Sequence, residues 1–192
     1  MGRRGSVILL LLVVAGGLLP GGFARPAAAE RVRFRIQPDA SQLTFKATSR
    51  LMNADGKFHR FRGEVLADTK DLATARVTLA VEAASIDTNI TRRDDHLRSE
   101  DFFHAERYPT ITFESIRVEP AGQRLTLVGR LTVRGVTREV AVPVDVEVSD
   151  STLVARGAFD LRRTDYGITY TSFMNPIGDV VRVAFTFRAR AS

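Results

Sequence analysis

Hydrophobic and polar positions alternate with a period of two along most of the chain from Val32 onward. In "QLTFKA", Leu43, Phe45 and Ala47 share one face, and in "EVAVPVDVEV" a valine stands at every second position from 140 to 148. This period is typical of strands with one buried face. The pattern predicts strands over nine runs: 32–37, 41–49, 58–68, 74–86, 110–119, 124–134, 137–148, 152–163 and 180–190.

Turn-forming residues separate these runs, among them "NADG" at 53–56 and "NPIG" at 175–178. The short connections between most runs imply antiparallel neighbours in a single domain. About eight strands of this kind favour an all-β barrel, because closing the sheet removes its exposed edges. A two-sheet sandwich is the alternative, and alternation alone does not distinguish the two.

One charged segment, "TRRDDHLRSEDFF" at 91–103, interrupts the alternation. Thr91 with Asp94 three residues later is similar to a capping box, and Asp94 and Arg98 are spaced to pair on a helix. We expect a short helical lid near residues 91–104, with its charges in water. The hydrophobic residues expected to turn inward and cover one end of the sheet are Leu97, Phe102 and Phe103.

The first 29 residues have the features of a secretory signal peptide. Two arginines precede an apolar run from Val7 to Leu19, and "ARPAAA" precedes Glu30. The run is shorter than the about 20 apolar residues that a spanning helix needs. We therefore predict cleavage after Ala29 and an exported domain over 30–192, periplasmic or extracellular; an uncleaved anchor is the alternative.

Charge and cysteine content narrow the classes of partner. Residues 1–29 hold three arginines and no acidic residue, so without them the formal net charge falls from +6 to +3. A balance this small gives little support for nucleic-acid binding. The chain has no cysteine, which excludes disulfides and thiolate metal sites.

Several longer motifs resemble the YceI-like family of exported lipid-binding proteins. They are "SIDTNITRRDDHLRSEDFFHAERYPTITFES" at 85–115, "GRLTVRGVTREVAVPV" at 129–144, "GKFHRFRGEVLAD" at 56–68, and "DYGI" with "IGDVVRVAFTF" near the end. The resemblance covers about residues 32 to 190. Many members carry a histidine near the end of the second strand, but this chain has none between Phe45 and Phe58. No role of that imidazole is therefore carried over.

The resemblance implies an eight-stranded antiparallel barrel, similar in shape to lipocalins, that holds a long apolar molecule without covalent chemistry. Polyprenyl chains, isoprenoid quinones and fatty amides are the ligand classes that it implies. The expected function is therefore binding, carriage or sequestration of an isoprenoid-type lipid, with transient membrane contact. The alternative is an exported protein-interaction module with a dry core, and a homodimer stays open.

The residue types on the inward rows are suited to an apolar pocket. Small residues expected there are Ala47, Gly129, Ala158 and Ala184. The predicted pocket residues are Leu43, Phe45, Leu97, Phe102, Phe103, Phe113, Phe159, Tyr170, Phe173 and Phe185. A barrel of eight strands either fills with its own side chains or holds one small ligand, so close packing is the alternative. Phe173 and Met174 are candidate portal residues, or they plug the open end.

A lipid head group needs polar partners at the mouth of such a pocket. The candidates are Arg93, His96 and Arg98 on the lid and Tyr166 before the last strand; a solvated helix face with ordinary ion pairs is the alternative for the arginines. The three histidines lack the spacing of a helix-borne zinc site, so we expect no metal and no cofactor. No G-x-S-x-G motif occurs, and we expect no enzyme.

Overall fold

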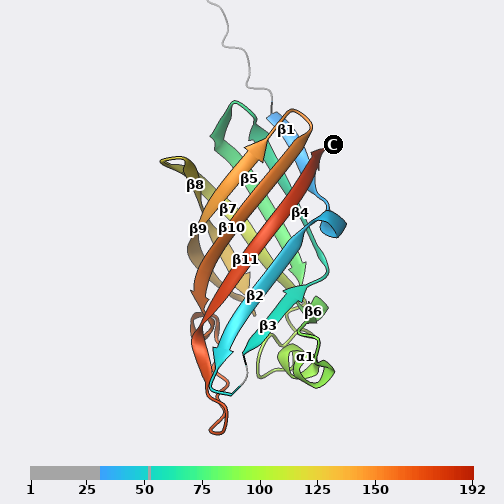
Figure 1. Ribbon diagram of the computed structural model, residues 1–192, viewed down its shortest axis with the longest axis vertical. Helices are drawn as coiled ribbons and strands as arrows, with labels where there is room; N and C mark the ends of the chain where they lie inside the picture. The colour runs from blue at the N-terminus through green and yellow to red at the C-terminus, as the bar shows by residue number, and fades with distance from the viewer. Residues whose placement is uncertain (1–30, 52) are drawn as a thin grey trace, which may run out of the picture.

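The computed structural model describes residues 31–51 and 53–192. Strands dominate it, with one α-helix and three short 3-10 segments (Figure 1). The elements are β1 (Arg31–Ile36), η1 (Pro38–Ala40), β2 (Gln42–Ser49), β3 (Ala54–Phe58), β4 (Phe61–Asp68), β5 (Asp71–Glu82), η2 (Ala83–Ser85), β6 (Ile86–Asp87), α1 (Thr91–Arg98), β7 (Thr110–Ala121), β8 (Arg124–Val133), β9 (Val136–Val148), β10 (Thr152–Arg162), η3 (Arg163–Tyr166) and β11 (Ile177–Ala191).

Eight strands close into an antiparallel barrel in the order β1-β4-β5-β7-β8-β9-β10-β11. The pairing of β1 with β11 closes it, with Phe34 opposite Ala191 and Ile36 opposite Ala189. Closure satisfies the backbone groups that an open sheet would leave at its edges. The predicted all-β antiparallel barrel is therefore confirmed, and the two-sheet sandwich is wrong.

The long strand β11 pairs with two successive strands along the same side. Residues 189–191 pair with β1, whereas residues 177–186 pair with β2. Between them the chain bends at η1, where Gln37 N donates to Arg188 O (2.8 Å) and Arg188 N donates to Ser41 Oγ (2.9 Å). Because β3 and β6 add to β2, the barrel wall extends at one end, the end that carries α1 (Figure 1).

Strand β3 corrects the predicted turn at 53–56. Ala54 lies opposite Ala47 and Gly56 opposite Phe45 in the ladder with β2, so the reversal comes earlier, between Ser49 and Ala54. The predicted run 58–68 is consequently divided between β3 and β4. The other turn, at 175–178, is shorter than predicted because β11 begins at Ile177. In both places cross-strand hydrogen bonds override residues that locally favour turns.

Helix α1 forms where a short helix was predicted, but it begins differently. Its N-cap is Ile90, so Thr91 is the first helical residue and the predicted capping box does not form. The Asp94 carboxylate instead reaches back beyond the helix, where it accepts hydrogen bonds from Thr88 N (2.9 Å) and Thr88 Oγ1 (2.5 Å). This carboxylate is buried, so the expectation that all lid charges face water is wrong for Asp94.

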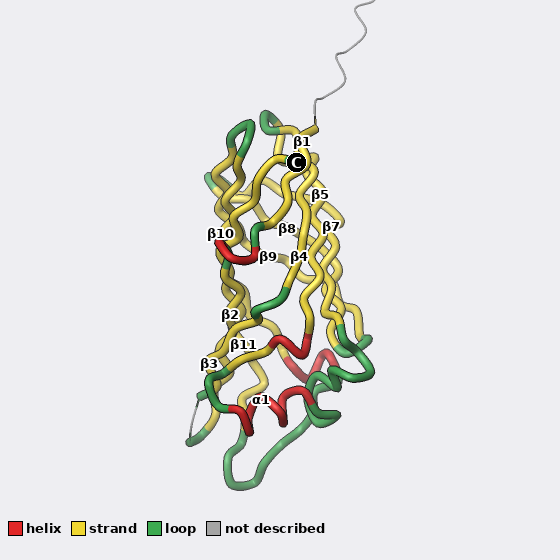
Figure 2. The backbone as a smooth tube through the Cα atoms, turned by 90° about the vertical axis from the view of Figure 1, so that its right-hand side faces the viewer, coloured by secondary structure: helices red, strands yellow, loops and turns green. Residues whose placement is uncertain are grey.

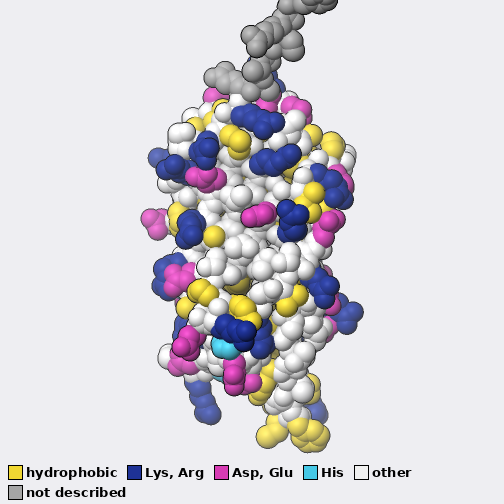
Figure 3. Space-filling model, turned by 180° about the vertical axis from the view of Figure 1, so that it is seen from behind, with side chains coloured by type: hydrophobic (Ala, Val, Ile, Leu, Met, Phe, Trp, Pro, Cys, Tyr) yellow, Lys and Arg dark blue, Asp and Glu magenta, His cyan; other side chains and the backbone are white. Residues whose placement is uncertain are grey.

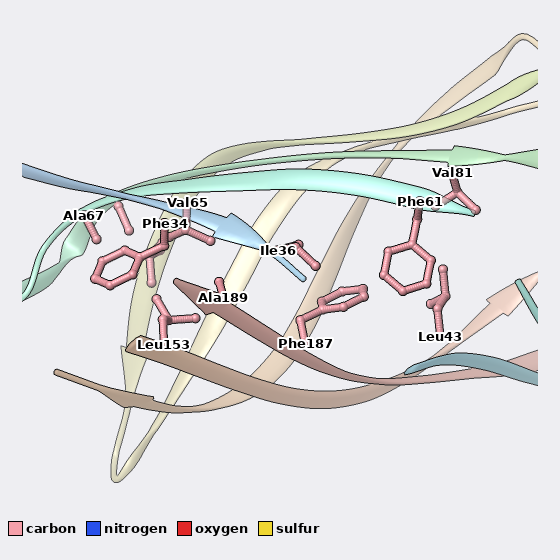
Figure 4. Close-up of a cluster of buried hydrophobic side chains, with 12 residues drawn as sticks. Phe34, Ile36, Leu43, Phe61, Val65, Ala67, Val81, Leu153, Phe187 and Ala189 are labelled. Atoms are coloured by element: carbon pink, nitrogen blue, oxygen red, sulfur yellow. The ribbon is translucent and has the colours of Figure 1, made fainter. Parts of the chain in front are cut away.

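The opposite end of the barrel is closed by packed side chains. Phe34 and Ala67 have no exposed surface, and both pack in one cluster with Val65, Leu153 and Ala189. Figure 4 shows these side chains pointing toward one another from β1, β4, β10 and β11. The barrel thus has a filled end near its two termini and an end covered by α1 and the loop before β11 (Figure 2).

Candidate functional site

A cavity of about 470 Å³ lies inside the barrel. Side chains at alternate strand positions line it, for example Leu125, Leu127 and Leu131 of β8 and Val142 and Val144 of β9. Val65, Leu153 and Ala189 line it whereas Phe34 and Ala67 do not, so the cavity extends as far as the packed cluster at the filled end. Its size lies in the range of small-molecule sites. The dry-core alternative requires a close-packed interior, and this interior is not close-packed.

Nearly all of the predicted pocket residues lie on the wall of this cavity. They are Leu43, Phe45, Leu97, Phe102, Phe103, Phe113, Phe159, Tyr170 and Phe185. The strands supply most of them through the inward row of the alternation, and the lid supplies Leu97, Phe102 and Phe103. The structure therefore brings together residues that are up to 142 positions apart in sequence, Leu43 and Phe185 being cross-strand partners.

Phe173 is the exception. Its side chain is 98% exposed and Met174 is 78% exposed, and neither lies on the cavity wall. Phe173 therefore does not line the pocket, and the two residues do not plug the barrel, which leaves the portal prediction for them. They occupy the outermost part of the loop before β11, beyond Asn175, which is bound to the neighbouring chain segment through its side chain.

Two of the small residues predicted to face inward, Ala158 and Ala184, are also misplaced. Successive residues of a strand point to opposite faces, and Phe159 and Phe185 take the inward positions beside them. Ala158 and Ala184 lie opposite each other in the β10–β11 ladder and are absent from the cavity wall. Ala47 does line the cavity, as predicted.

Glycines in neighbouring strands make room for three of the aromatic rings on the wall. Phe113 lies against Gly129, Phe185 against Gly157 and Phe45 against Gly56, in each case where a Cβ atom would collide with the ring. A ring that lies against a glycine leaves more of the barrel interior open than a ring that projects inward. The glycines at these positions therefore help to keep the cavity open.

Helix α1 is held in place by hydrogen bonds that also orient its cavity-facing side chains. Arg93 Nε donates to Thr88 Oγ1 (2.8 Å), and the Arg93 guanidinium also donates to the carbonyls of Thr88 (3.0 Å) and Asn53 (3.2 Å). His96 Nε2 lies 2.9 Å from Asp101 Oδ2. Both Arg93 and His96 lie on the cavity wall, as the head-group prediction requires.

Arg98, a predicted head-group residue, does not lie on the cavity wall. It donates to the carbonyls of Ala84 (2.9 Å) and Ile86 (2.8 Å) and pairs with Asp95 at 3.0 Å, not with Asp94. These bonds tie the end of α1 to η2 and β6. Arg98 therefore has a structural role in fixing the lid.

An aromatic cluster joins the lid to the loop that follows η3. The His96 ring meets Tyr170 edge-on, with centroids 4.8 Å apart, and meets Phe102 in the same way at 5.0 Å. Phe102 and Tyr170 are 5.1 Å apart. Edge-to-face rings at these separations attract one another. The two segments therefore close the same end of the cavity as one unit.

Tyr166 is a buried residue of the cavity wall. Its side chain is only 2% exposed, and its hydroxyl makes no hydrogen bond with another residue in the described part of the chain. Burial, with a smaller contribution from the nearby Asp165 carboxylate, raises the pKa of Tyr166 to about 12. The hydroxyl is thus protonated at neutral pH.

Arg163 is a cavity residue that the sequence analysis missed. It is 8% exposed and donates to the carbonyls of Gly178 (3.1 Å), Ile168 (2.6 Å) and Ile177 (3.2 Å). No carboxylate pairs with it within residues 31–51 and 53–192, so backbone carbonyls are the acceptors of its guanidinium at the cavity wall. A signal was present, because residue 163 continues the inward row of residues 153–161.

No cluster of metal-binding side chains occurs among the described residues, and no helix there is long and apolar enough to cross a membrane.

Two serines lie near His96 in the sequence and could be considered as nucleophiles. Ser85 Oγ donates to Glu82 O (2.7 Å) and Ser99 Oγ donates to His96 O (2.7 Å). Neither serine is hydrogen-bonded to the His96 ring, which bonds Asp101. These side chains therefore do not form a nucleophile and base pair in this arrangement.

Comparison with solved structures places the barrel among known folds. BcnA of Burkholderia cenocepacia superposes with a TM-score of 0.74 at 24% identity, covering 80% of this chain and 98% of BcnA. A polyisoprenoid binding domain from Saccharophagus degradans, implicated in plant cell wall breakdown, superposes with a TM-score of 0.66 at 16% identity, covering 84% of this chain and 99% of that domain. At such identities the likeness shows the fold alone.

Sequence relatives agree with this placement. Protein YceI of Escherichia coli is 41% identical over 87 residues, and a UPF0312 protein of Photorhabdus laumondii is 37% identical over 91 residues. These matches cover 45% and 47% of this chain, and 46% and 47% of the relatives, so the chain spans about half the length of the curated relatives it matches. The model of the YceI-like domain matches residues 34–189, which is nearly the whole described barrel. The chain therefore belongs to the YceI-like domain family.

Proposed function

We propose that this protein is an exported, non-enzymatic carrier that holds an isoprenoid-type lipid in its barrel. The observation that supports this most directly is the cavity of about 470 Å³ with apolar walls along the strands. The description of the Saccharophagus domain as polyisoprenoid binding supports the same class of guest. A polyprenyl chain, an isoprenoid quinone or a fatty amide has the required apolar length.

The distribution of polar side chains in the wall suggests how the guest is oriented. Arg93, His96, Arg163, Tyr166 and Tyr170 all come from α1, η3 or the loop after η3, at the lid end. The apolar tail would run from there toward Phe34, and the oxygen-bearing end would lie near the arginine and tyrosine groups. Each methylene buried in this way contributes about 0.8 kcal/mol, so the tail supplies most of the affinity.

The assignment to an exported compartment rests on residues 1–29, which lie outside the described residues. A carrier between membranes must also touch a membrane when it loads or releases its lipid. Non-enzymatic binding is favoured because the polar groups on the cavity wall include donors for a head group but no assembled nucleophile and base.

The test is native mass spectrometry of the mature protein, purified without detergent, followed by solvent extraction and identification of what is released. We expect a stoichiometric apolar adduct of the isoprenoid class. A clean apo mass that persists after incubation with polyprenyl and quinone lipids would contradict the proposal.

A matched pair of variants shows where the guest binds. Ala155 lines the cavity, whereas Ala158 on the same strand does not. Ala155→Trp should fill the cavity and abolish the adduct, while Ala158→Trp should retain it. Equal retention by both folded variants would place the guest outside the barrel.

A further inference from the structure

Exposed hydrophobic side chains gather at the lid end of the molecule. The large hydrophobic residues that are exposed in the described part of the chain are Leu51, Ile90, Phe173, Met174 and Val180. Three of them, Leu51, Phe173 and Met174, belong to two loops that touch each other, and we name them the apolar tip. The tip forms the projecting hydrophobic end of the surface in Figure 3.

Specific hydrogen bonds hold the two loops of the apolar tip together. Arg50 N donates to Pro176 O (3.1 Å), and Leu51 N donates to Asn175 Oδ1 (2.9 Å). Within the second loop, Asn175 N donates to Ser172 Oγ (3.3 Å). The hydrogen bonds therefore hold both loops in a conformation that exposes these side chains. Exposure of a phenylalanine to water is unfavourable in free energy.

The apolar tip lies next to the cavity wall. Thr48 and Ser49, at the end of β2 just before Leu51, line the cavity, and Ser172 and Asn175, which flank Phe173 and Met174, line it as well. The second loop thus faces the cavity with Ser172 and Asn175 and presents Phe173 and Met174 to solvent. If the tip inserts into an apolar environment, the lid end of the cavity lies directly beside that environment.

Two exposed cations lie at the lid end of the molecule. Arg50 precedes Leu51, and Arg92 lies in the first turn of α1; both are exposed, and neither forms an ion pair within the described ranges. On the barrel wall, Arg124 pairs with Asp145 and Arg60 with Glu82, whereas Arg130 and Arg190 form no ion pair among the described residues. Unpaired cations beside protruding apolar side chains are complementary to the phosphates of an anionic lipid surface.

We propose that the apolar tip docks the protein on a phospholipid bilayer, with Phe173, Met174 and Leu51 inserted among the acyl chains and Arg50 and Arg92 on lipid phosphates. This inference rests on the proposed carrier function, because it names the membrane contact through which the lipid enters. Three side chains on a projection are too few for a stable protein interface, which needs roughly 800 Å² per partner. Amphipathic projections of this size are suited to shallow insertion at a membrane interface.

Flotation of the purified protein with vesicles of phosphatidylethanolamine and phosphatidylglycerol tests the proposal. We expect the wild-type protein to float and the double variant Phe173→Ser with Met174→Ser to bind at least about tenfold more weakly. Val180→Ser removes an exposed hydrophobic residue of β11 outside the tip and should not change binding. Because Phe173 is almost fully exposed, thermal unfolding of the double variant should match that of the wild type.

A second pair of variants tests the contribution of the cations. Arg50→Glu reverses a charge beside the apolar tip, and Arg190→Glu is the control, because Arg190 lies at the end of β11 away from the tip. Only the first should weaken flotation, and vesicles of phosphatidylcholine should bind the wild type less well. Equal flotation of tip and control variants would overturn the proposal. So would absence of flotation together with a concentration-dependent dimer that the tip variant loses, because the tip would then join two copies.

The lipid-extraction experiment separates the two proposals. A stoichiometric lipid adduct without vesicle binding would leave the carrier function standing and refute the docking surface. Vesicle binding by a protein that never holds lipid would refute the carrier function and leave the docking surface standing.

Discussion

The ring of Phe45 lies against Gly56, its cross-strand partner in the β2–β3 ladder. A Cβ atom on Gly56 would lie 2.5 Å from Phe45 Cζ, well inside van der Waals contact. Phe45 also contacts Phe58 (centroids 5.8 Å apart), and Phe58 meets Phe103 edge-on at 5.9 Å. This single glycine therefore positions a series of rings that extends from the barrel wall to the lid.

Gly56→Ala should displace the Phe45 ring into the cavity. Overpacking of this kind costs about 1–3 kcal/mol, and the narrower cavity should release bound lipid several-fold faster. Release of lipid to acceptor vesicles and urea unfolding measure the two effects. Phe45→Leu in the same chain should restore part of the retention, because it removes the collision with the ring but not the one with Thr88 Cγ2 at 2.8 Å; no gain at all from this second change would contradict the account.

Phe103→Leu should loosen lipid retention. Phe103 lies on the cavity wall and links the lid to Phe58, so a smaller side chain opens the contact between lid and barrel. The control is Phe34→Leu at the filled end, which should lower the free energy of unfolding by about 1 kcal/mol without faster release. If Phe103→Leu also changes only stability, residues 91–103 are not a lid.

Tyr166→Phe should separate head-group binding from folding. The hydroxyl has no partner in the described residues, so its removal should change the free energy of unfolding by less than about 0.5 kcal/mol. Loss of a hydrogen bond worth about 1 kcal/mol should lower the affinity for a quinone lipid about fivefold. The affinity for a hydrocarbon of equal length should not change. Tyr108→Phe, outside the cavity wall, is the control. Equal loss for both guests would exclude this hydroxyl as a head-group contact.

Asp179→Asn should reduce stability in a pH-dependent way. Hydrogen bonds from Thr164, followed by the one from Arg162 Nε (2.6 Å), lower the pKa of Asp179 to about 2. A lowered pKa in the folded state means that the stabilisation is complete above the unfolded value of about 3.9 and is lost as the pH falls through about 2.

Urea unfolding of wild type and Asp179→Asn, from neutral pH down to about pH 2.5, measures this effect. The difference between them should narrow as the pH falls, and Thr164→Val should remove part of the same pH dependence. A difference that stays constant across the range would show that the carboxylate charge is not what stabilises this site.

The sequence was sufficient for much of the barrel and of the cavity wall. A strand places every second side chain on one face whatever it pairs with, so the rows that contain Leu43, Phe113 and Phe185 could be predicted from local alternation. The helix at 91–98 could likewise be located, because a charged segment without alternation stands out between strands. Family motifs over most of the chain supported the same barrel.

Other features depend on partners that are distant in sequence, and only the tertiary structure decided them. Residues 54–56 form a strand because β2 pairs with them, although their composition favours a turn. Arg98 binds carbonyls of η2 and β6, which come close to the helix end only when the chain between them folds back. Asp94 accepts hydrogen bonds from Thr88, only six positions away, and this local bond replaces the predicted cap. Phe173 faces water because the loops of the apolar tip bind each other through Asn175, a contact across 124 positions. Alternation reports which face a side chain occupies, but long-range pairing decides what that face meets.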